Sequence, residues 1–182
     1  MSQKAKTRKR GKGIFMKNVL TRTIHMPFNS IGSNIKVNIK KTLESDLYGK
    51  CSKEGYIKTN SIKILSYSSG VVQADKVVFE VMFECLICCP VEGQIIKCNV
   101  KNITRAGIRA VYANEDPSPI TIFVARDHHY NQEQFTKIKE EEDIVIRVIG
   151  VRFELNDESI SVLGELKLQK KKPKVKVTIA DD

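Results

Sequence analysis

Cys89-Pro90-Val91-Glu92-Gly93-Gln94 is the stretch that separates two unlike halves of this 182-residue chain. Before it, apolar residues alternate with other residues from Val77 to Ile87, which is typical of a strand with one buried face. Pro90 cannot donate a ladder hydrogen bond, and Gly93 tolerates backbone angles that other residues avoid, so the strand cannot continue through this stretch. We therefore predict a boundary between two structural units here.

The first half predicts a small sheet covered by one helix. A strand is expected over residues 15–26, and Asn29 or Ser30 can cap the helix that follows it. The apolar residues of that helix recur every four positions and form one stripe, which is Ile31, Ile35, Ile39, Leu43 and Leu47. A polar loop over residues 49–55, a strand over residues 56–65, a turn over residues 66–70 and the long strand before the boundary complete the unit.

The second half predicts a barrel. Five strand candidates are separated by polar stretches, and the longest of these, between the third and fourth candidates, has room for a turn or two of helix around residues 132–140. This is the layout of a five-stranded OB-fold barrel. The candidates are residues 94–104, 107–113, 120–125, 144–153 and 159–166. The predicted fold class is therefore α+β followed by all-β, with an N-terminal domain over residues 14–90 and an OB-fold domain over residues 91–168.

The formal net charge of +10 is carried by the two ends of the chain. Residues 1–13 contain six basic residues and no acidic one, and residues 167–182 contain six lysines and two aspartates. The segment between the two ends is neutral as a whole. We expect residues 1–13 and 169–182 to be disordered basic arms that can contact nucleic acid, and residues 6–12 are also compatible with a nuclear-import signal.

Composition favours an intracellular protein. No segment approaches the roughly 18 consecutive apolar residues of a membrane-spanning helix, and the basic first residues lack the apolar core of a secretory signal. The five cysteines are irregularly spaced, which indicates reduced thiols. Cys85 and Cys88 form a C-x-x-C pair, but residues three apart in a strand point to opposite faces, and a lone pair supplies half of a zinc shell. We therefore expect no metal and no cofactor.

The predicted barrel offers a physical basis for binding single-stranded RNA. OB barrels stack bases on exposed aromatic rings while basic side chains follow the phosphates. In the alternative interpretation, Phe123 is a core residue and the basic side chains are solvated or paired with acidic residues 140–143. The candidate RNA-binding residues are Lys97, Lys101, Arg105, Arg109, Tyr112, Phe123, Arg126, His129, Tyr130 and Arg147.

The long strand before the boundary predicts a protein partner. Its apolar face carries more side chains than one helix over so small a sheet can easily cover, and exposed apolar surface of this kind marks interfaces. The candidate residues of this partner-subunit interface are Val77, Phe79, Val81, Phe83 and Pro90.

The sequence Asp127-His128-His129 is similar to the D-H-H element of a phosphoesterase family, and paired histidines can bind metal. Such a site needs further aspartates from earlier strands, and the first half contains only Asp46 and Asp75. No serine or cysteine nucleophile stands beside a base, and no glycine loop is suited to phosphate. We therefore expect a non-catalytic protein, and a metal-dependent phosphoesterase is the least favoured alternative.

Several short motifs follow one another along residues 15–166. They are Gly49 and Cys51 followed by Gly55-Tyr56-Ile57, Gly70 ahead of the strand from Val77 to Phe83, the stretch from Pro90 to Gln94, Gly107 in the second barrel strand, and the stretch from Ile160 to Leu166. In this order they resemble the stalk subunit of multisubunit DNA-directed RNA polymerases, the family of the seventh subunit of eukaryotic polymerase II and of its archaeal counterpart. The chain differs from that family in its basic N-terminal segment, in Gln94 where glutamate is usual, and in a compressed barrel insertion. These differences suggest a divergent member, such as one from a large DNA virus.

The resemblance implies a non-catalytic subunit of a transcription complex. In the family, a tip domain with a truncated RNP-like sheet docks on the polymerase core, a smaller partner subunit binds along the seam between the domains, and the OB barrel lies beside the RNA exit path. The docking residues carried over by position are Lys50, Cys51, Ser52, Lys53, Glu54 and Gly55. The expected partners are polymerase core subunits, a smaller stalk subunit and single-stranded nascent RNA. The expected location is the nucleus, or the cytoplasmic factory and virion of a virus.

A free-standing OB-fold RNA-binding protein, such as a translation factor or an RNA chaperone, is the alternative function. The first half of the chain discriminates between the two functions, because a free-standing RNA chaperone has no need for a helix-on-sheet unit ahead of its barrel. We therefore favour the polymerase subunit.

Overall fold

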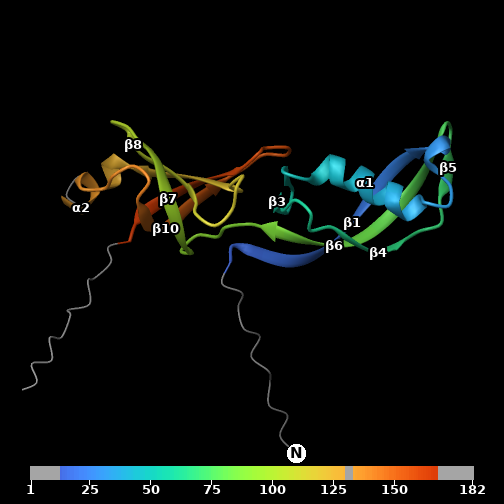
Figure 1. Cartoon of the computed structure of the whole chain (residues 1–182), viewed down its shortest axis with the longest axis horizontal. Coiled ribbons are helices and arrows are strands. Elements are labelled where there is room, and N and C mark those ends of the chain that lie inside the picture. Colours follow the sequence, from blue (N-terminus) through green and yellow to red (C-terminus); the bar gives the residue numbers. More distant parts are fainter. Residues whose placement is uncertain (1–12, 130–132, 168–182) are drawn as a thin grey trace, which may run out of the picture.

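The structure is a computed structural model that describes residues 13–129 and 133–167. Its first half is built around the long strand β6 (Lys76–Cys88), which pairs with β1 (Phe15–Pro27) in antiparallel register along its whole length (Figure 1). Three short strands pair one after another with the other edge of β6, namely β5 (Val71–Gln73), β4 (Lys63–Tyr67) and β3 (Gly55–Ile57). Strand β2 (Cys51–Ser52) pairs with β3 and completes a six-stranded sheet.

One helix, α1 (Ile35–Leu47), covers one face of this sheet. Ile39 and Leu43 of the helix are buried in the same cluster as Val81 and Phe83 of β6. Ile35 and Leu47 pack against this cluster, so the predicted apolar stripe is confirmed except for Ile31, which precedes the helix. The other face of the sheet is open to solvent over much of its area, as antiparallel sheets permit.

The predicted helix start is wrong. The helix follows Asn34, whose side chain makes no capping hydrogen bond, whereas Phe28–Ser30 form a short 3-10 helix, η1. The backbone of Ser30 is nevertheless tied to the helix, because its carbonyl oxygen accepts a 2.8 Å hydrogen bond from Nδ2 of Asn38. Residues 29 and 30 therefore belong to a turn of their own and do not begin α1.

The strand expected over residues 56–65 is two strands, β3 and β4, separated by a turn. In this turn Asn60 has a positive φ of 56°, and Oγ of Ser61 donates a 2.6 Å hydrogen bond to the carbonyl oxygen of Lys58. The same hydroxyl accepts a 3.2 Å hydrogen bond from the amide of Leu86 on β6. These side-chain hydrogen bonds stabilise a turn inside the segment that apolar periodicity predicts as one continuous strand.

The second half is a closed five-stranded barrel, which confirms the predicted fold class. Around the barrel the strand order is β10, β11, β9, β8 and β7, with β9 and β11 parallel and the other neighbours antiparallel. The strands are β7 (Ile95–Ile103), β8 (Gly107–Tyr112), β9 (Ile120–Ala125), β10 (Asp143–Arg152) and β11 (Ile160–Leu166). The insertion before β10 carries two short helices, η2 (Arg126–His129) and α2 (Glu133–Thr136).

The two halves share buried residues at their junction. One buried cluster lies within the sheet and helix, and the second lies within the barrel but also takes in Ile14, Cys51, Tyr56 and Cys88 from the first half. The main chain of Cys51 pairs with the β10–β11 hairpin, since its amide donates to the carbonyl oxygen of Asp157 at 2.8 Å and its carbonyl oxygen accepts from the amide of Asn156 at 2.9 Å. Two buried clusters agree with a division near residue 90, although the division into two domains stays a prediction.

The C-x-x-C cysteines lie in different clusters, as strand geometry predicts. Cys85 is buried in the cluster of the sheet and Cys88 in that of the barrel, and all five cysteines are free thiols. Over residues 13–129 and 133–167, no group of three or more His, Cys, Asp or Glu side chains could hold a metal ion. None of the helices described there has the length and apolarity needed to cross a membrane.

Replacing Gly107 with alanine should destabilise the barrel. Gly107 has a φ of 153°, and a Cβ there would overlap the carbonyl oxygen of Val124 and lie 3.1 Å from Cα of Ala125. We expect Gly107→Ala to lower the free energy of unfolding by about 1–3 kcal/mol, because the clash is with backbone of the neighbouring strand. Gly150→Ala is the matched control, since a Cβ at Gly150 on β10 would meet no atom within 4 Å. Urea denaturation that shows equal stability for the two variants would contradict this packing.

The buried thiols should be unreactive in the folded protein. Burial raises the pKa of Cys88 and Cys98 to about 12 and that of Cys51 and Cys85 to about 11, so these thiols stay protonated at pH 8. Only Cys89 is partly exposed. We expect a disulfide reagent to modify one thiol of the folded chain at pH 8 and five after denaturation, measured by absorbance. Rapid modification of several thiols before unfolding would contradict the described burial.

Candidate interfaces for nucleic acid and protein partners

A row of exposed side chains crosses three strands on the outside of the barrel. Arg109 on β8 lies opposite Phe123 on β9, and Phe123 in turn lies opposite Leu163 on β11. Phe123 is 45% exposed and Leu163 is 37% exposed, and Arg109 is exposed as well. Because residues opposite one another on neighbouring strands share a face, these three side chains form a continuous surface, which we call the outer platform.

The alternation of β9 places Phe123 on this surface. Ile120, Ile122 and Val124 are buried in the barrel, so the side chain of Phe123 points outward. The alternative interpretation of Phe123 as a core residue therefore does not hold. A phenylalanine ring open to solvent beside an arginine is an arrangement on which a base can stack while its phosphate meets a cation.

Two of the candidate cations are neutralised by acidic neighbours. Nζ of Lys101 lies 3.0 Å from Oε2 of Glu141, and Nη2 of Arg147 lies 2.5 Å from Oε2 of Glu165. The hydrogen bond and the charge of Arg147 hold the pKa of Glu165 below its usual value. These two cations are therefore paired with acidic residues, as the alternative interpretation expects. The partner of Lys101 lies within the acidic residues 140–143, and the partner of Arg147 lies on β11.

The remaining candidate cations lie in two places. Arg105 is exposed in the turn between β7 and β8, and Arg126 fixes that turn by donating to the carbonyl oxygens of Arg105 at 2.9 Å and Thr104 at 3.1 Å. Arg126 also lies over the ring of Phe135, 5.4 Å from its centroid. Lys97 is exposed on β7, on the side of the barrel that pairs with β10. Arg105 and Arg109 are thus the exposed arginines of the β7–β8 hairpin, which also carries the exposed Lys97 and the paired Lys101.

Two aromatic candidates are buried and do not join the outer platform. Tyr112 is 7% exposed and His129 is 2% exposed. Nε2 of His129 accepts a 2.9 Å hydrogen bond from the amide of Leu166, and Nδ1 lies 2.7 Å from the carbonyl oxygen of Ala125, so the ring is neutral with its proton on Nδ1. With both nitrogens engaged, His129 fastens η2 to the barrel and is not placed to serve a phosphoesterase site. Tyr130 lies outside the described residues.

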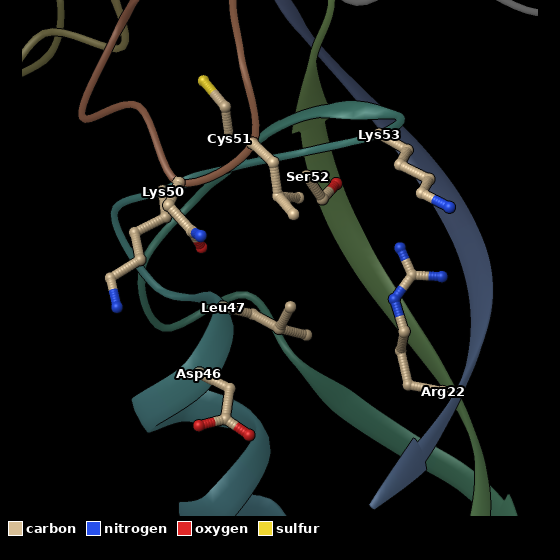
Figure 2. Close-up of a pocket in the computed structure, with 9 residues that line it drawn as sticks. Arg22, Asp46, Leu47, Lys50, Cys51, Ser52 and Lys53 are labelled. Carbon is tan, nitrogen blue, oxygen red and sulfur yellow. The ribbon is translucent and has the colours of Figure 1, made fainter.

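The loop predicted to dock on a polymerase lies beside the barrel and not at the free end of the sheet (Figure 2). Cys51, Ser52 and Gly55 are buried there, and Lys50 and Lys53 are exposed. Burial alone would raise the pKa of Glu54, but hydrogen bonds from Arg22 at 2.5 Å and Ser52 at 2.9 Å outweigh it and lower the pKa.

A pocket of about 260 Å³ opens between this loop, the end of α1 and the β10–β11 hairpin (Figure 2). We call it the seam pocket. It is lined by Arg22, Asp46, Leu47, Lys50, Cys51, Ser52, Lys53, Leu155 and Asn156. Its lining combines two leucines, of which Leu155 is 63% exposed, with three basic side chains and one acidic side chain. Sequence analysis missed Leu155 and Asn156, because only the folded structure places their hairpin beside residues 50–53.

The predicted partner-subunit interface on β6 is covered by the chain itself. Val77, Phe79, Val81 and Phe83 are at most 6% exposed, and Pro90 is buried. The exposed apolar surface expected on this face is absent, because β1, β3, β4 and the turn before β4 contribute buried residues to the same cluster as α1. These include Leu20, Ile24, Ile57, Ile62 and Ile64. A partner therefore cannot reach this face in the folded structure.

The end of the sheet that carries β5 lies furthest from the barrel (Figure 1). Exposed apolar side chains that sequence analysis missed lie at this end. Phe28 is 49% exposed, and Val71 and Val72 are 59% and 65% exposed. They lie at the same end, because Lys76 pairs with Pro27 on one side and with Gln73 on the other. We call Phe28, Val71 and Val72 the free-end patch. The adjacent valines beside a glycine are the signal in the sequence that could have indicated it.

Three relatives match most of the chain. It is 23% identical to DNA-directed RNA polymerase II subunit 7 of Arabidopsis thaliana over 171 residues, which cover 85% of this chain and 93% of the plant protein. It is 22% identical to the polymerase II subunit RPB7 of Glycine max over the same shares. A provisionally named DNA-directed RNA polymerase subunit of Acanthamoeba polyphaga mimivirus is 23% identical over 155 residues, covering 78% of this chain and 75% of the viral protein. No family model matches the chain. With an N-terminal sheet and helix followed by a five-stranded barrel, this chain is a distant homologue of the seventh subunit of RNA polymerase II.

Proposed function

We propose that this chain is a non-catalytic stalk subunit of a DNA-directed RNA polymerase. The observation that carries the proposal is the length of the match, which runs through both the sheet and the barrel and covers 93% of the plant subunit. A free-standing OB-fold protein would match in its barrel alone. As a polymerase subunit, the chain would act where its polymerase acts, in the nucleus or in the factory and virion of a virus.

The free-end patch is the surface we propose for docking on the polymerase core. These three exposed apolar side chains gather at the tip of the sheet, on both of its faces because Val71 and Val72 are successive strand residues, and apolar side chains are costly to leave in water. Residues 50–55 serve this role less well, because Cys51, Ser52 and Gly55 are buried and the main chain of Cys51 pairs with the β10–β11 hairpin.

The seam pocket is the surface we propose for a smaller partner subunit. A partner lying there would contact Lys50 and Lys53 of the loop and Leu155 of the barrel hairpin at once. Leu155 would supply apolar contact, and the lysines would favour an acidic segment of the partner. In this proposal the partner binds across the junction and not on the buried face of β6.

The outer platform is the surface we propose for nascent RNA. Phe123 offers a ring for stacking, Arg109 supplies a cation beside it, and Leu163 widens the apolar contact. The platform lies on the barrel, away from the free-end patch, so RNA and the polymerase core would bind different parts of the subunit.

Replacing Phe123 with alanine should weaken RNA binding. Stacking on an aromatic side chain contributes about 1–3 kcal/mol per base, so we expect Phe123→Ala to raise the Kd for a uridine 20-mer at least about fivefold. Fluorescence anisotropy measures this directly. Phe28→Ala removes an aromatic ring of similar exposure from the other end of the molecule and should leave the Kd unchanged. Equal Kd values for wild type and Phe123→Ala would contradict the platform.

Removing the free-end patch should release the subunit from the polymerase. Tagged chain purified from its source should carry polymerase core subunits, and the triple variant Phe28→Ala, Val71→Ser and Val72→Ser should carry several-fold less, measured by mass spectrometry. All three side chains are exposed, so the variant should keep its fold, which circular dichroism checks. Phe123→Ala is the matched control and should retain the core subunits. Wild-type chain that carries none of them would refute the stalk proposal, and full recovery with the triple variant would refute the docking surface.

A further inference from the structure

A buried histidine at one end of the barrel belongs to none of the three proposed surfaces. His129 of η2 is 2% exposed. Its Nε2 accepts a 2.9 Å hydrogen bond from the amide of Leu166, the last residue of β11. Its Nδ1 lies 2.7 Å from the carbonyl oxygen of Ala125, the last residue of β9. The ring therefore ties η2 to the ends of two barrel strands, and we call these two contacts the histidine clasp.

The ring of His129 also packs against an aromatic side chain of the barrel core. It stacks on Phe135 of α2, with ring centroids 5.3 Å apart and planes inclined by 17°. Phe135 is 4% exposed and belongs to the buried cluster of the barrel. The guanidinium group of Arg126 lies 5.4 Å from the centroid of Phe135 and donates hydrogen bonds to two carbonyl oxygens of the β7–β8 turn. The clasp thus supports a packed group of side chains that reaches this turn.

The neutral form of His129 is the form that can make both contacts. Nε2 must keep its lone pair to accept from the amide of Leu166, whereas a protonated histidine donates from both nitrogens. A proton on Nε2 would set two N–H groups against each other and leave the amide of Leu166 without its acceptor. It would also place a positive charge in a buried site, where an unpaired charge is costly. Proton uptake and formation of the clasp therefore exclude each other.

The acid that could stabilise a protonated ring is already paired. Strands β8, β9 and β11 pack against η2, and α2 contributes the ring that stacks on His129. The titratable and charged residues of η2 and of these elements are Arg126, Asp127, His128, Arg109, Tyr112, Glu133 and Glu165. The hydrogen bond and charge of Arg147 are the main causes that lower the pKa of Glu165, and the charge of His129 adds to them. Because Arg147 holds Glu165, a protonated His129 would lack a carboxylate of its own there.

We propose that the histidine clasp is an acid-sensitive switch, which ties η2 to the end of β11 while His129 is neutral and opens when the ring takes up a proton. Histidine is the side chain whose charge ordinarily changes between about pH 5 and 8. The unfolded chain takes up this proton and the clasped chain does not, so the free energy of unfolding falls as the pH is lowered through this range. The switch requires neither RNA nor a polymerase.

The experiment uses a full-length chain in which His129 is the sole histidine. The protein contains three histidines, and the other two, His25 and His128, are exposed and are replaced by glutamine. At pH 5.5 a free histidine is about ten parts protonated to one part neutral. We therefore expect the ratio of folded to unfolded chain, measured by urea denaturation, to be about tenfold smaller at pH 5.5 than at pH 8.

The matched control carries His129→Gln in addition. Glutamine can accept a hydrogen bond from the amide of Leu166 but does not titrate, so the ratio of folded to unfolded control chain should change by less than about twofold between the two pH values. A tenfold fall in the control as well would overturn the switch, because other groups would then cause the pH dependence.

Nuclear magnetic resonance of the single-histidine chain gives an answer even if the control does not fold. With isotope-labelled histidine, the ring of His129 should be neutral at pH 8, with its proton on Nδ1. On acidification the ring should gain its second proton at the same pH at which the amide signal of Leu166 moves. A ring that takes up the proton while this amide signal stays in place overturns the inference. Equal ratios of folded to unfolded single-histidine chain at the two pH values do so too.

Discussion

The structure depends on the alternation of side chains along β6. Successive residues of this strand point to opposite faces, so its apolar residues build the core under α1 while its last residue, Cys88, reaches the core of the barrel. The strand stops at Cys88 because Pro90 cannot pair, and the chain then enters β7. One strand therefore joins two cores, and the main-chain pairing of Cys51 with the β10–β11 hairpin closes the same junction from the other side. A break in the alternation of β6 would disturb both halves at once.

This arrangement distributes three kinds of surface over the molecule. The free-end patch lies at the end of the sheet furthest from the barrel, the seam pocket lies at the junction, and the outer platform lies on the barrel wall. In the proposed function, the polymerase core, the partner subunit and RNA would each bind a different one of these surfaces, so that no contact would block another. The charge follows the same division, since residues 14–90 contain ten basic and six acidic residues while the barrel is acidic.

Periodicity was sufficient to predict the fold but only part of the sites. Alternation predicted β6 and every barrel strand, and each barrel strand begins and ends within one residue of the expected position. The same rule also indicates which side of the barrel wall a residue occupies, and Tyr112 is buried because it is in phase with Ala110 and Ile108. Alternation cannot predict the burial of His129, because this residue lies in a 3-10 helix. It also cannot predict that the apolar face of β6 is buried, because the residues that bury it come from segments far apart in the chain. The seam pocket could not be predicted either, because it requires a contact between residues near 51 and residues near 156.

The most direct test of this account is photocrosslinking of 4-thiouridine in nascent transcripts within the affinity-purified polymerase, followed by mapping of the crosslinked peptides. The account predicts crosslinks to peptides of this chain that contain Phe123 or Leu163, with none in α1 or at the free end of the sheet. Crosslinks confined to residues 14–90, or a purified polymerase that lacks this chain, would contradict it.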